Sequence, residues 1–394
     1  MGCFEYVLRK RGSRPEADLA LTSADEVAKA KQFHSDIPGY APTPLVERPA
    51  LAGKLGVGQL WVKDESQRFG LNAFKALGGS YAMAGYLAGR LERQPDEVTF
   101  RELCSLETRE KLGNVTFYTA TDGNHGRGVA WSARLLGHKS VVYMPKGSAL
   151  ERLENIRAQG ARAEITELNY DDAVRLADRE AKTTGGVLIQ DTAWPGYEEI
   201  PARIMQGYTT LAGEIMEQLD GQRPTHLFLQ AGVGSFAGAV LGAFAAHWGA
   251  DRPVTCIMEP DKADCLFRTA RADDGQLHFV TGDMDSMMAG LCCGEPCTIS
   301  WKIIDSYADG FISCADEYSA LGMRLLGRAE AGDMPVVSGE SGAVGAGVLS
   351  AIMTEDRLSD LRDALGLGPD SRVLLISTEG DTDQENYRNI LSQD

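Results

Sequence analysis

The stretch FGLNAFKALGGSYAMAG, residues 69–85, places a single lysine, Lys75, between the polar turn residue Asn72 and a Gly-Gly step that opens an alanine-rich helix. A lysine at the start of a helix lies near the positive end of the peptide dipoles, which favours the neutral amine that forms a Schiff base. Apolar and aromatic residues surround it in the sequence, and burial among them would lower the pKa of the amine: Phe74, Leu77, Tyr81 and Met83. The stretch therefore predicts a reactive amine, although an arbitrary lysine is far more often a solvated surface residue.

Two glycine-rich loops follow strand-like runs, and each opens a helix. In TDGNHGRGVAW (121–131), which follows VTFYTA, glycines let the backbone approach a ligand, and Asn124 supplies an amide that can bond a ring oxygen. In QAGVGSFAGAV (230–240), which follows HLFLQA, backbone N–H groups form a phosphate cradle at a helix N-terminus: Gly232, Val233, Gly234 and Ser235. A single loop of this kind is often only a tight turn, so the prediction depends on both loops together with Lys75.

Together these features resemble the fold type II pyridoxal-phosphate enzymes, the group of the tryptophan synthase β-subunit. Within that group the chain resembles the diaminopropionate ammonia-lyase family, from about residue 30 to the C-terminus. Further stretches that carry the resemblance are SDIPGYAPTPL (35–45), VKDESQRFGLNAFKALGGSYA (62–82), QDTAWPGYEEIP (190–201), MAGLCCGEP (288–296), SGESGAVGAG (338–347) and ISTEGDTD (376–383). These stretches are long enough to be specific.

Short apolar runs alternate with helical periodicity, which predicts parallel sheets covered on both faces. The strands are expected at 60–64, 115–120, 140–145, 162–166, 186–191, 226–231, 254–260 and 373–378, and the clearest helices at 124–136, 149–159, 170–183, 203–219 and 236–248. The resemblance implies an α/β enzyme of fold type II, with two open parallel-sheet domains and the cofactor between them. It also implies that a small mobile domain, 86–195, is inserted into a large cofactor-binding domain made of 1–85 and 196–394.

The resemblance also assigns roles around pyridoxal 5'-phosphate. Lys75 would carry the cofactor as a Schiff base and act as a base or acid on its face of the ring, while Asn124 would bond the ring's 3′ oxygen. Gly232, Val233, Gly234 and Ser235 would hold the phosphate. Ser377 in STEGDTD resembles the hydroxyl that faces the pyridine nitrogen, and Thr378 is the nearby alternative. The structural alternative is that Ser377 only caps a turn at the end of a strand.

Two carboxylates, Asp122 and Asp191, distinguish the chain from its relatives. Many fold type II enzymes carry a serine at the position of Asp122, and the dehydratase pattern does not require Asp191. Ammonia leaves well only when it is protonated, and an ammonium side chain binds well to a carboxylate. We therefore expect both aspartates to be catalytic, with turn capping as the alternative for each because both stand at strand ends.

The resemblance implies that the chain is a carbon–nitrogen lyase of amino-acid catabolism, which converts 2,3-diaminopropionate into pyruvate and two ammonia. Two enzymatic alternatives share most of these stretches: a serine or threonine dehydratase and a β-replacement enzyme. A catalytically inactive, cofactor-binding regulatory protein is the alternative from another class, and the retention of Lys75 and the acidic groups weighs against it.

Composition fits an ordinary enzyme of two domains. A chain of 394 residues exceeds what one core usually holds. The formal net charge of -17 disfavours nucleic acid and anionic membranes as partners. The sequence contains neither an apolar run of about 20 residues nor a secretory signal at its start. We expect a cytoplasmic protein, a homodimer, whose partner is a small amino-acid substrate.

The remaining reactive side chains receive weaker expectations. Eight cysteines in a chain of this length do not make a disulfide framework, and their spacing fits no common zinc pattern. A bridge from Cys265 to Cys292 or Cys293 stays open. His125 is expected to be a structural imidazole bonded to backbone more than a base. Glu340 either faces the cofactor ring or satisfies N–H groups at a helix start.

Overall fold

A computed structural model describes residues 2–121, 123–328 and 330–393. Its larger sheet has seven strands in the order β1-β10-β9-β8-β11-β3-β2. The five inner strands are parallel, whereas the edge strands β1 and β2 run antiparallel to their neighbours. The strands are β1 (Phe4–Leu8), β2 (Leu45–Glu47), β3 (Gln59–Asp64), β8 (His226–Gln230), β9 (Val254–Pro260), β10 (Gly310–Cys314) and β11 (Arg372–Ser377).

The smaller sheet has four parallel strands in the order β6-β5-β4-β7. Its strands are β4 (Thr116–Ala120), β5 (Lys139–Met144), β6 (Arg162–Ile165) and β7 (Val187–Leu188). All four lie within 86–195, and the seven strands of the larger sheet come from the two flanks. The strands of the smaller sheet therefore lie, in the sequence, between strands of the larger one. The boundary itself stays a prediction, because α3 (Ala76–Arg90) runs across residue 86.

Helices cover both faces of the larger sheet, because alternate side chains of its buried strands point to opposite sides. Leu227 and Leu229 pack with the helices of one side, and Phe228 packs with those of the other. The first group is α1 (Ala24–Ser35), α3, α9 (Glu199–Gln218), α10 (Ser235–Trp248), α11 (Cys265–Ala272) and α12 (Thr298–Tyr307). The second is α2 (Pro49–Leu55), α13 (Asp316–Gly327), α14 (Glu340–Thr354), α15 (Ser359–Leu365) and α16 (Gln384–Ser392).

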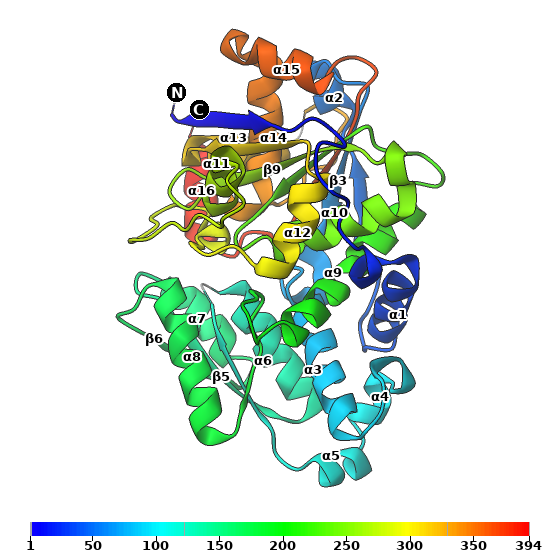
Figure 1. The fold of residues 1–394 in the computed structure, drawn as a ribbon. Helices are drawn as coiled ribbons and strands as arrows, with labels where there is room; N and C mark the ends of the chain where they lie inside the picture. Colours follow the sequence, from blue (N-terminus) through cyan, green and yellow to red (C-terminus); the bar gives the residue numbers. More distant parts are fainter. Residues whose placement is uncertain (1, 122, 329, 394) are drawn as a thin grey trace.

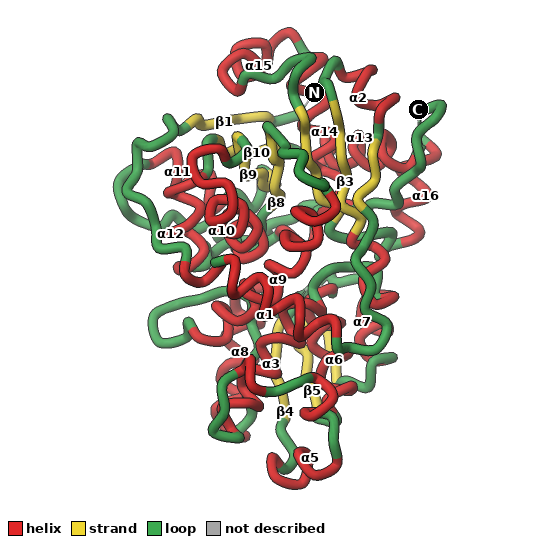
Figure 2. Tube along the Cα trace, turned by 90° about the vertical axis from the view of Figure 1, so that its right-hand side faces the viewer, coloured by secondary structure: helices red, strands yellow, loops and turns green. Residues whose placement is uncertain are grey.

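The smaller sheet is covered in the same way. α8 (Tyr170–Thr184) packs on one face against Tyr118 and Val141, while α6 (Asn124–Leu136) and α7 (Leu150–Arg157) pack on the other against Val142. The short helices α4 (Phe100–Leu103) and α5 (Leu106–Leu112) precede β4. Figures 1 and 2 show this unit below the larger one, with α3 and α9 at the junction. Among the described residues, no helix has the length and apolar character needed to cross a membrane.

A buried network of four charged side chains fixes the turn that leads to Lys75. Glu214 on α9 accepts from Lys63 on β3 and from Arg68, each at 2.7 Å, and Arg68 also bonds Glu65 at 2.8 Å. All four side chains are almost fully buried. Two cations therefore balance two anions, and removal of one member would leave a buried charge uncompensated, which typically costs about 3–5 kcal/mol.

Candidate active site

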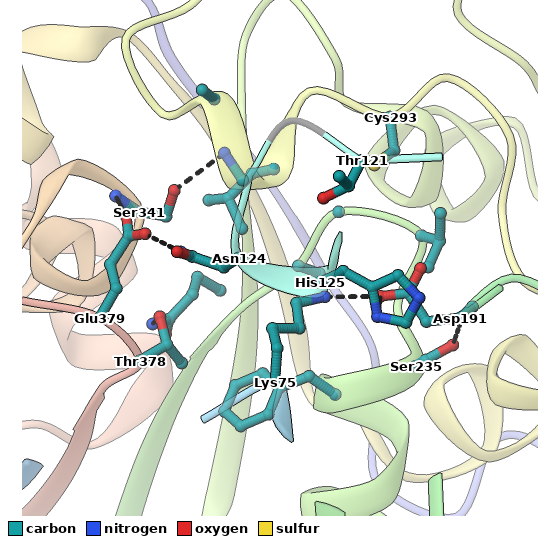
Figure 3. A pocket seen from close by; sticks show the side chains of 18 of the residues that line it. Lys75, Thr121, Asn124, His125, Asp191, Ser235, Cys293, Ser341, Thr378 and Glu379 are labelled. Atoms are coloured by element: carbon teal, nitrogen blue, oxygen red, sulfur yellow. Dashed lines mark hydrogen bonds and ion pairs between the residues drawn. The ribbon is translucent and has the colours of Figure 1, made fainter. Parts of the chain in front are cut away.

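A pocket between the two sheets collects the carboxyl ends of their strands and the starts of the following helices, the usual ligand position in open α/β sheets. Figure 3 shows this pocket. Its lining comes from six places: Phe74 and Lys75; Thr121, Asn124 and His125; Tyr170 and Asp191; 230–236; 289–291 with Cys293; and Ser341 with Thr378 and Glu379. The structure thus brings Lys75, Asn124, Asp191, Thr378 and the glycine loop together.

Lys75 stands immediately before α3, as its sequence indicates, and extends into the pocket. Its Nζ donates to Asp191 Oδ2 at 2.6 Å, and its side chain is 20% exposed. The amine also lies 5.4 Å from the ring centroid of Phe74 and 5.8 Å from that of Tyr208. Phe74 was expected as a neighbour, whereas Tyr208 comes from α9 and no local pattern connects it with Lys75.

Asp191 is a buried carboxylate held in its ionised form. Burial alone would raise its pKa, but the Lys75 ammonium and then His125 oppose this effect and lower the pKa to about 2. His125 Nδ1 lies 3.8 Å from Asp191 Oδ2, and His125 Nε2 bonds the Ile189 carbonyl at 2.9 Å. The imidazole is therefore bonded to backbone under the loop, as expected from the sequence.

The loop at 232–235 has the geometry of an anion cradle. Gly234 has φ of +99°, a left-handed conformation that favours glycine, and α10 begins at the next residue. The first N–H groups of a helix have no carbonyl partner within that helix, so they remain available to an anion in the pocket. The Ser235 hydroxyl donates to the Asp191 backbone carbonyl, which connects the loop to the segment that carries the Asp191 carboxylate.

Asn124 lies at the first position of α6 and faces the carboxylate of Glu379, a residue of ISTEGDTD for which the sequence predicts no role. Its Nδ2 donates to Glu379 Oε2, while Glu379 Oε1 accepts the Ser341 N–H at 2.9 Å. Figure 3 shows Asn124 and Glu379 facing each other across the pocket from Asp191. In the sequence, Glu379 stands out only as a charged residue shortly after the end of a buried strand, which does not by itself indicate a contact with Asn124.

Of the two candidate hydroxyls, Thr378 lines the pocket and Ser377 lies behind it. Ser377 Oγ donates to Ser338 Oγ at 2.7 Å and lies 3.2 Å from the Glu379 carbonyl. Thr378 Oγ1 accepts from Gln230 Nε2 at 2.9 Å, which leaves its own O–H for another acceptor. Adjacent residues at a strand end point to opposite sides, so only one of the pair reaches the pocket.

Three other expectations have different outcomes. Asp122 lies outside the described residues, so its role stays a prediction. Glu340 is the first residue of α14 and bonds Asn386 at 2.7 Å, and it lines a second cavity beside the pocket. All eight cysteines are thiols: Cys265 Sγ lies 3.7 Å from Glu259 Oε1, and Cys292 Sγ lies 3.6 Å from the Met288 carbonyl.

The amine, the amide and the anion cradle are the groups that pyridoxal phosphate requires, and the described residues fit it. The chain belongs to the family of pyridoxal-phosphate dependent enzymes, whose model matches residues 37–379. The fold of type II and the cofactor expected from the sequence are thereby confirmed.

Among individual proteins, the chain is similar to the diaminopropionate ammonia-lyase of Salmonella typhimurium, with 52% identity over 392 residues that cover 98% of this chain and 97% of that one. It is also similar to the crystal structure of the Escherichia coli diaminopropionate ammonia-lyase in complex with D-serine, with a TM-score of 0.91, 45% identity and coverage of 99% and 97%. The same E. coli enzyme, solved with an aminoacrylate-PLP azomethine reaction intermediate, matches with a TM-score of 0.90, 45% identity and the same coverage. The resemblance that the sequence stretches indicate is therefore confirmed.

Proposed function

We propose that the chain catalyses the α,β-elimination of 2,3-diaminopropionate, in which the substrate and one water give pyruvate and two molecules of ammonia. The observation that carries this proposal is the ionised, buried Asp191 beside Lys75, in a pocket that also holds an anion cradle. A carboxylate of this kind binds an ammonium group, whereas a hydroxyl leaving group does not require it. The similarity over nearly the whole chain to diaminopropionate ammonia-lyases supports the same substrate.

Pyridoxal phosphate, when bound, supplies an electron sink for bond cleavage at the carbon atoms next to the substrate's amino group. Lys75 would carry the cofactor through its amine and, once the substrate has replaced it, move the proton at the α-carbon on its own face. Residues 232–235 would hold the phosphate through their N–H groups, and Asn124 would hold the ring oxygen. Thr378, which lines the pocket, is the better placed of the two hydroxyls for the pyridine nitrogen, and Ser377 supports it from behind.

The two aspartates divide the remaining work. Asp191 would bind the β-ammonium group of the substrate, at the position where it now binds the Lys75 ammonium. Asp122 would act on the opposite face of the ring, where it can take the α-proton of the other enantiomer and protonate the departing amine. The small domain, 86–195, would exclude water from the reacting atoms when it closes on the large one.

Substrate screening tests the proposal. The purified holoenzyme is incubated with each enantiomer of 2,3-diaminopropionate, with serine and with threonine, and 2-oxo acid and ammonia are measured. We expect the highest kcat/KM on diaminopropionate, with two ammonia released per pyruvate. A higher kcat/KM on serine or threonine would identify a dehydratase, and consumption of an added thiol a β-replacement enzyme. Absence of any turnover, with the cofactor bound, would identify a regulatory protein.

We further propose that the enzyme is a cytoplasmic homodimer with no nucleic acid or membrane partner, as the resemblance and the net charge of -17 imply. Light scattering of the purified holoenzyme measures its mass directly. A mass equal to one chain of 42.5 kDa would contradict the dimer.

A further inference from the structure

Glu379 is a buried carboxylate at the edge of the pocket for which the proposed reaction has no chemical use. It lies two residues after the end of β11 and is 2% exposed. One of its oxygens accepts the Ser341 N–H at the start of α14, and the other accepts the side-chain amide of Asn124. Thr382 Oγ1 also donates to the second oxygen, at 3.5 Å. A carboxylate that accepts hydrogen bonds on both oxygens has a fixed orientation, which in turn orients the groups that donate to it.

The partner of Glu379 determines which way the Asn124 amide faces. Asn124 Nδ2, and not its Oδ1, lies against Glu379 Oε2, so Asn124 turns its NH₂ group, and not its carbonyl, toward Glu379. The amide nitrogen carries two hydrogens, and Glu379 uses one of them. The second N–H is left for the pocket, which Asn124 itself lines.

The same bond joins the two sheets. Asn124 follows β4 of the four-stranded sheet, whereas Glu379 and Ser341 belong to the seven-stranded sheet and its helix α14. Figure 3 shows the two side chains meeting on one side of the pocket, away from Asp191. The bond therefore forms only when the two sheets are in the relative position seen here.

We propose that Glu379 is a positioning residue: it orients the Asn124 amide so that its second N–H points to the ring oxygen of the cofactor, and it links that orientation to the apposition of the two sheets. The proposal rests on the proposed role of Asn124 as the ligand of the ring oxygen. The plain alternative is that Glu379 only caps α14 through the Ser341 N–H.

A double-mutant cycle on cofactor affinity separates these roles. The dissociation constant of pyridoxal phosphate is measured by titration of the cofactor-free protein for the wild type, Glu379→Gln, Asn124→Ala and the double variant. Glutamine offers one acceptor oxygen in place of two, so Glu379→Gln should raise the dissociation constant by roughly tenfold, as expected for the loss of one buried hydrogen bond. In the Asn124→Ala background the same change should add less than about twofold, because the two residues act as a unit.

Glu259→Gln is the matched control. Glu259 is buried like Glu379 and likewise accepts backbone hydrogen bonds at a helix start, in its case two, from the N–H groups of Leu266 at 2.9 Å and Phe267 at 2.6 Å in α11. It lies outside the pocket lining among the described residues. We expect this control to lower the melting temperature of the cofactor-free protein and to leave the cofactor dissociation constant unchanged. A lower melting temperature with an unchanged dissociation constant in Glu379→Gln would overturn the proposal, and so would additive effects in the cycle. Either result would show that Glu379 only caps α14.

Two further results keep the test decisive. If Asn124→Ala leaves the dissociation constant unchanged, the proposed role of Asn124 fails and the positioning role fails with it, whatever Glu379→Gln does. If Glu379→Gln does not fold, Glu379→Asp takes its place in the cycle. The shorter carboxylate cannot bond Ser341 and Asn124 together, so the dissociation constant should rise by roughly tenfold in the wild-type background and by less than about twofold in the Asn124→Ala background. Equal changes in the two backgrounds would overturn the proposal.

Discussion

Replacement of Glu340 by glutamine should remove a pH-dependent loss of stability. The Glu340 side chain is buried at the first position of α14, where Oε1 accepts from Asn386 on α16. Among the described residues, its Oε2 has no hydrogen-bond partner, and the guanidinium of Arg152 on α7 lies 4.0 Å away. Burial, together with the Glu379 carboxylate, raises the pKa of Glu340 from 4.5 to about 7.

The sign and size of the effect follow from this pKa. Between about pH 4.5 and pH 7 the folded protein keeps a proton that the unfolded chain releases, so folding is weakened as the pH rises through this window. The full effect is about 3 kcal/mol, of which most develops between about pH 5 and pH 8. Glutamine has the same shape and no charge, so Glu340→Gln should be spared this loss.

Urea unfolding of the cofactor-free protein, followed by tryptophan fluorescence at about pH 5 and about pH 8, measures the effect. The free energy of unfolding of Glu340→Gln minus that of the wild type should increase by about 2–3 kcal/mol from the lower to the higher pH. Glu110→Gln, an exposed carboxylate on α5, is the control and should change little. An identical pH dependence in Glu340→Gln and the wild type would refute the reasoning.

Three further predictions concern the pocket directly. Lys75→Ala should abolish turnover and the visible absorption band of the lysine-bound cofactor while far-UV circular dichroism is unchanged; a retained band would contradict the assignment. Gly234→Val should raise the cofactor dissociation constant strongly. It should also lower the stability of the protein by about 1–3 kcal/mol, because Gly234 has φ of +99° and an added β-carbon would lie 3.0 Å from Ser300 Oγ; equal cofactor affinity in the variant and the wild type would contradict the phosphate role. Asp122→Asn should lower kcat/KM on one enantiomer of diaminopropionate by roughly 10²–10⁴-fold, whereas Asp191→Asn should weaken both mainly through KM; a small, uniform loss for Asp122→Asn would return it to turn capping.

Most strands of both sheets could be predicted from the sequence, whereas the two edge strands of the larger sheet, β1 and β2, and its inner strand β10 could not. Continuous apolar runs such as 254–260 coincide with β9, and the helix expected at 124–136 coincides with α6. β1 was missed because two of its five residues are half-buried and three are exposed, so its pattern resembles that of a surface loop. β2 has three residues, which is too short for a periodic signal. β10 has the sequence GFISC, in which a glycine and a serine interrupt the apolar run that marks the other buried strands.

The candidate site was predictable where it depends on local backbone. Lys75, Asn124 and the loop at 232–235 are each placed by a strand end and a helix start that a window of sequence reveals. Tyr208 and Glu379 were missed because their neighbours are far away in the chain: Tyr208 reaches Lys75 from α9, and Glu379 meets Asn124 across the two sheets. Such contacts are set by tertiary packing and leave no periodicity in the sequence.

The place of β11 in the larger sheet has a consequence for synthesis of the chain. β11 is almost the last element to be made, yet it pairs with β3 near the start of the chain and with β8 on its other side. The nascent polypeptide can assemble the four-stranded sheet as soon as residue 188 is available. The sides of β3 and β8 that pair with β11 keep unpaired backbone groups until β11 has been synthesised. Truncation before residue 372 should therefore direct the chain to aggregation, while the 116–188 sheet still forms.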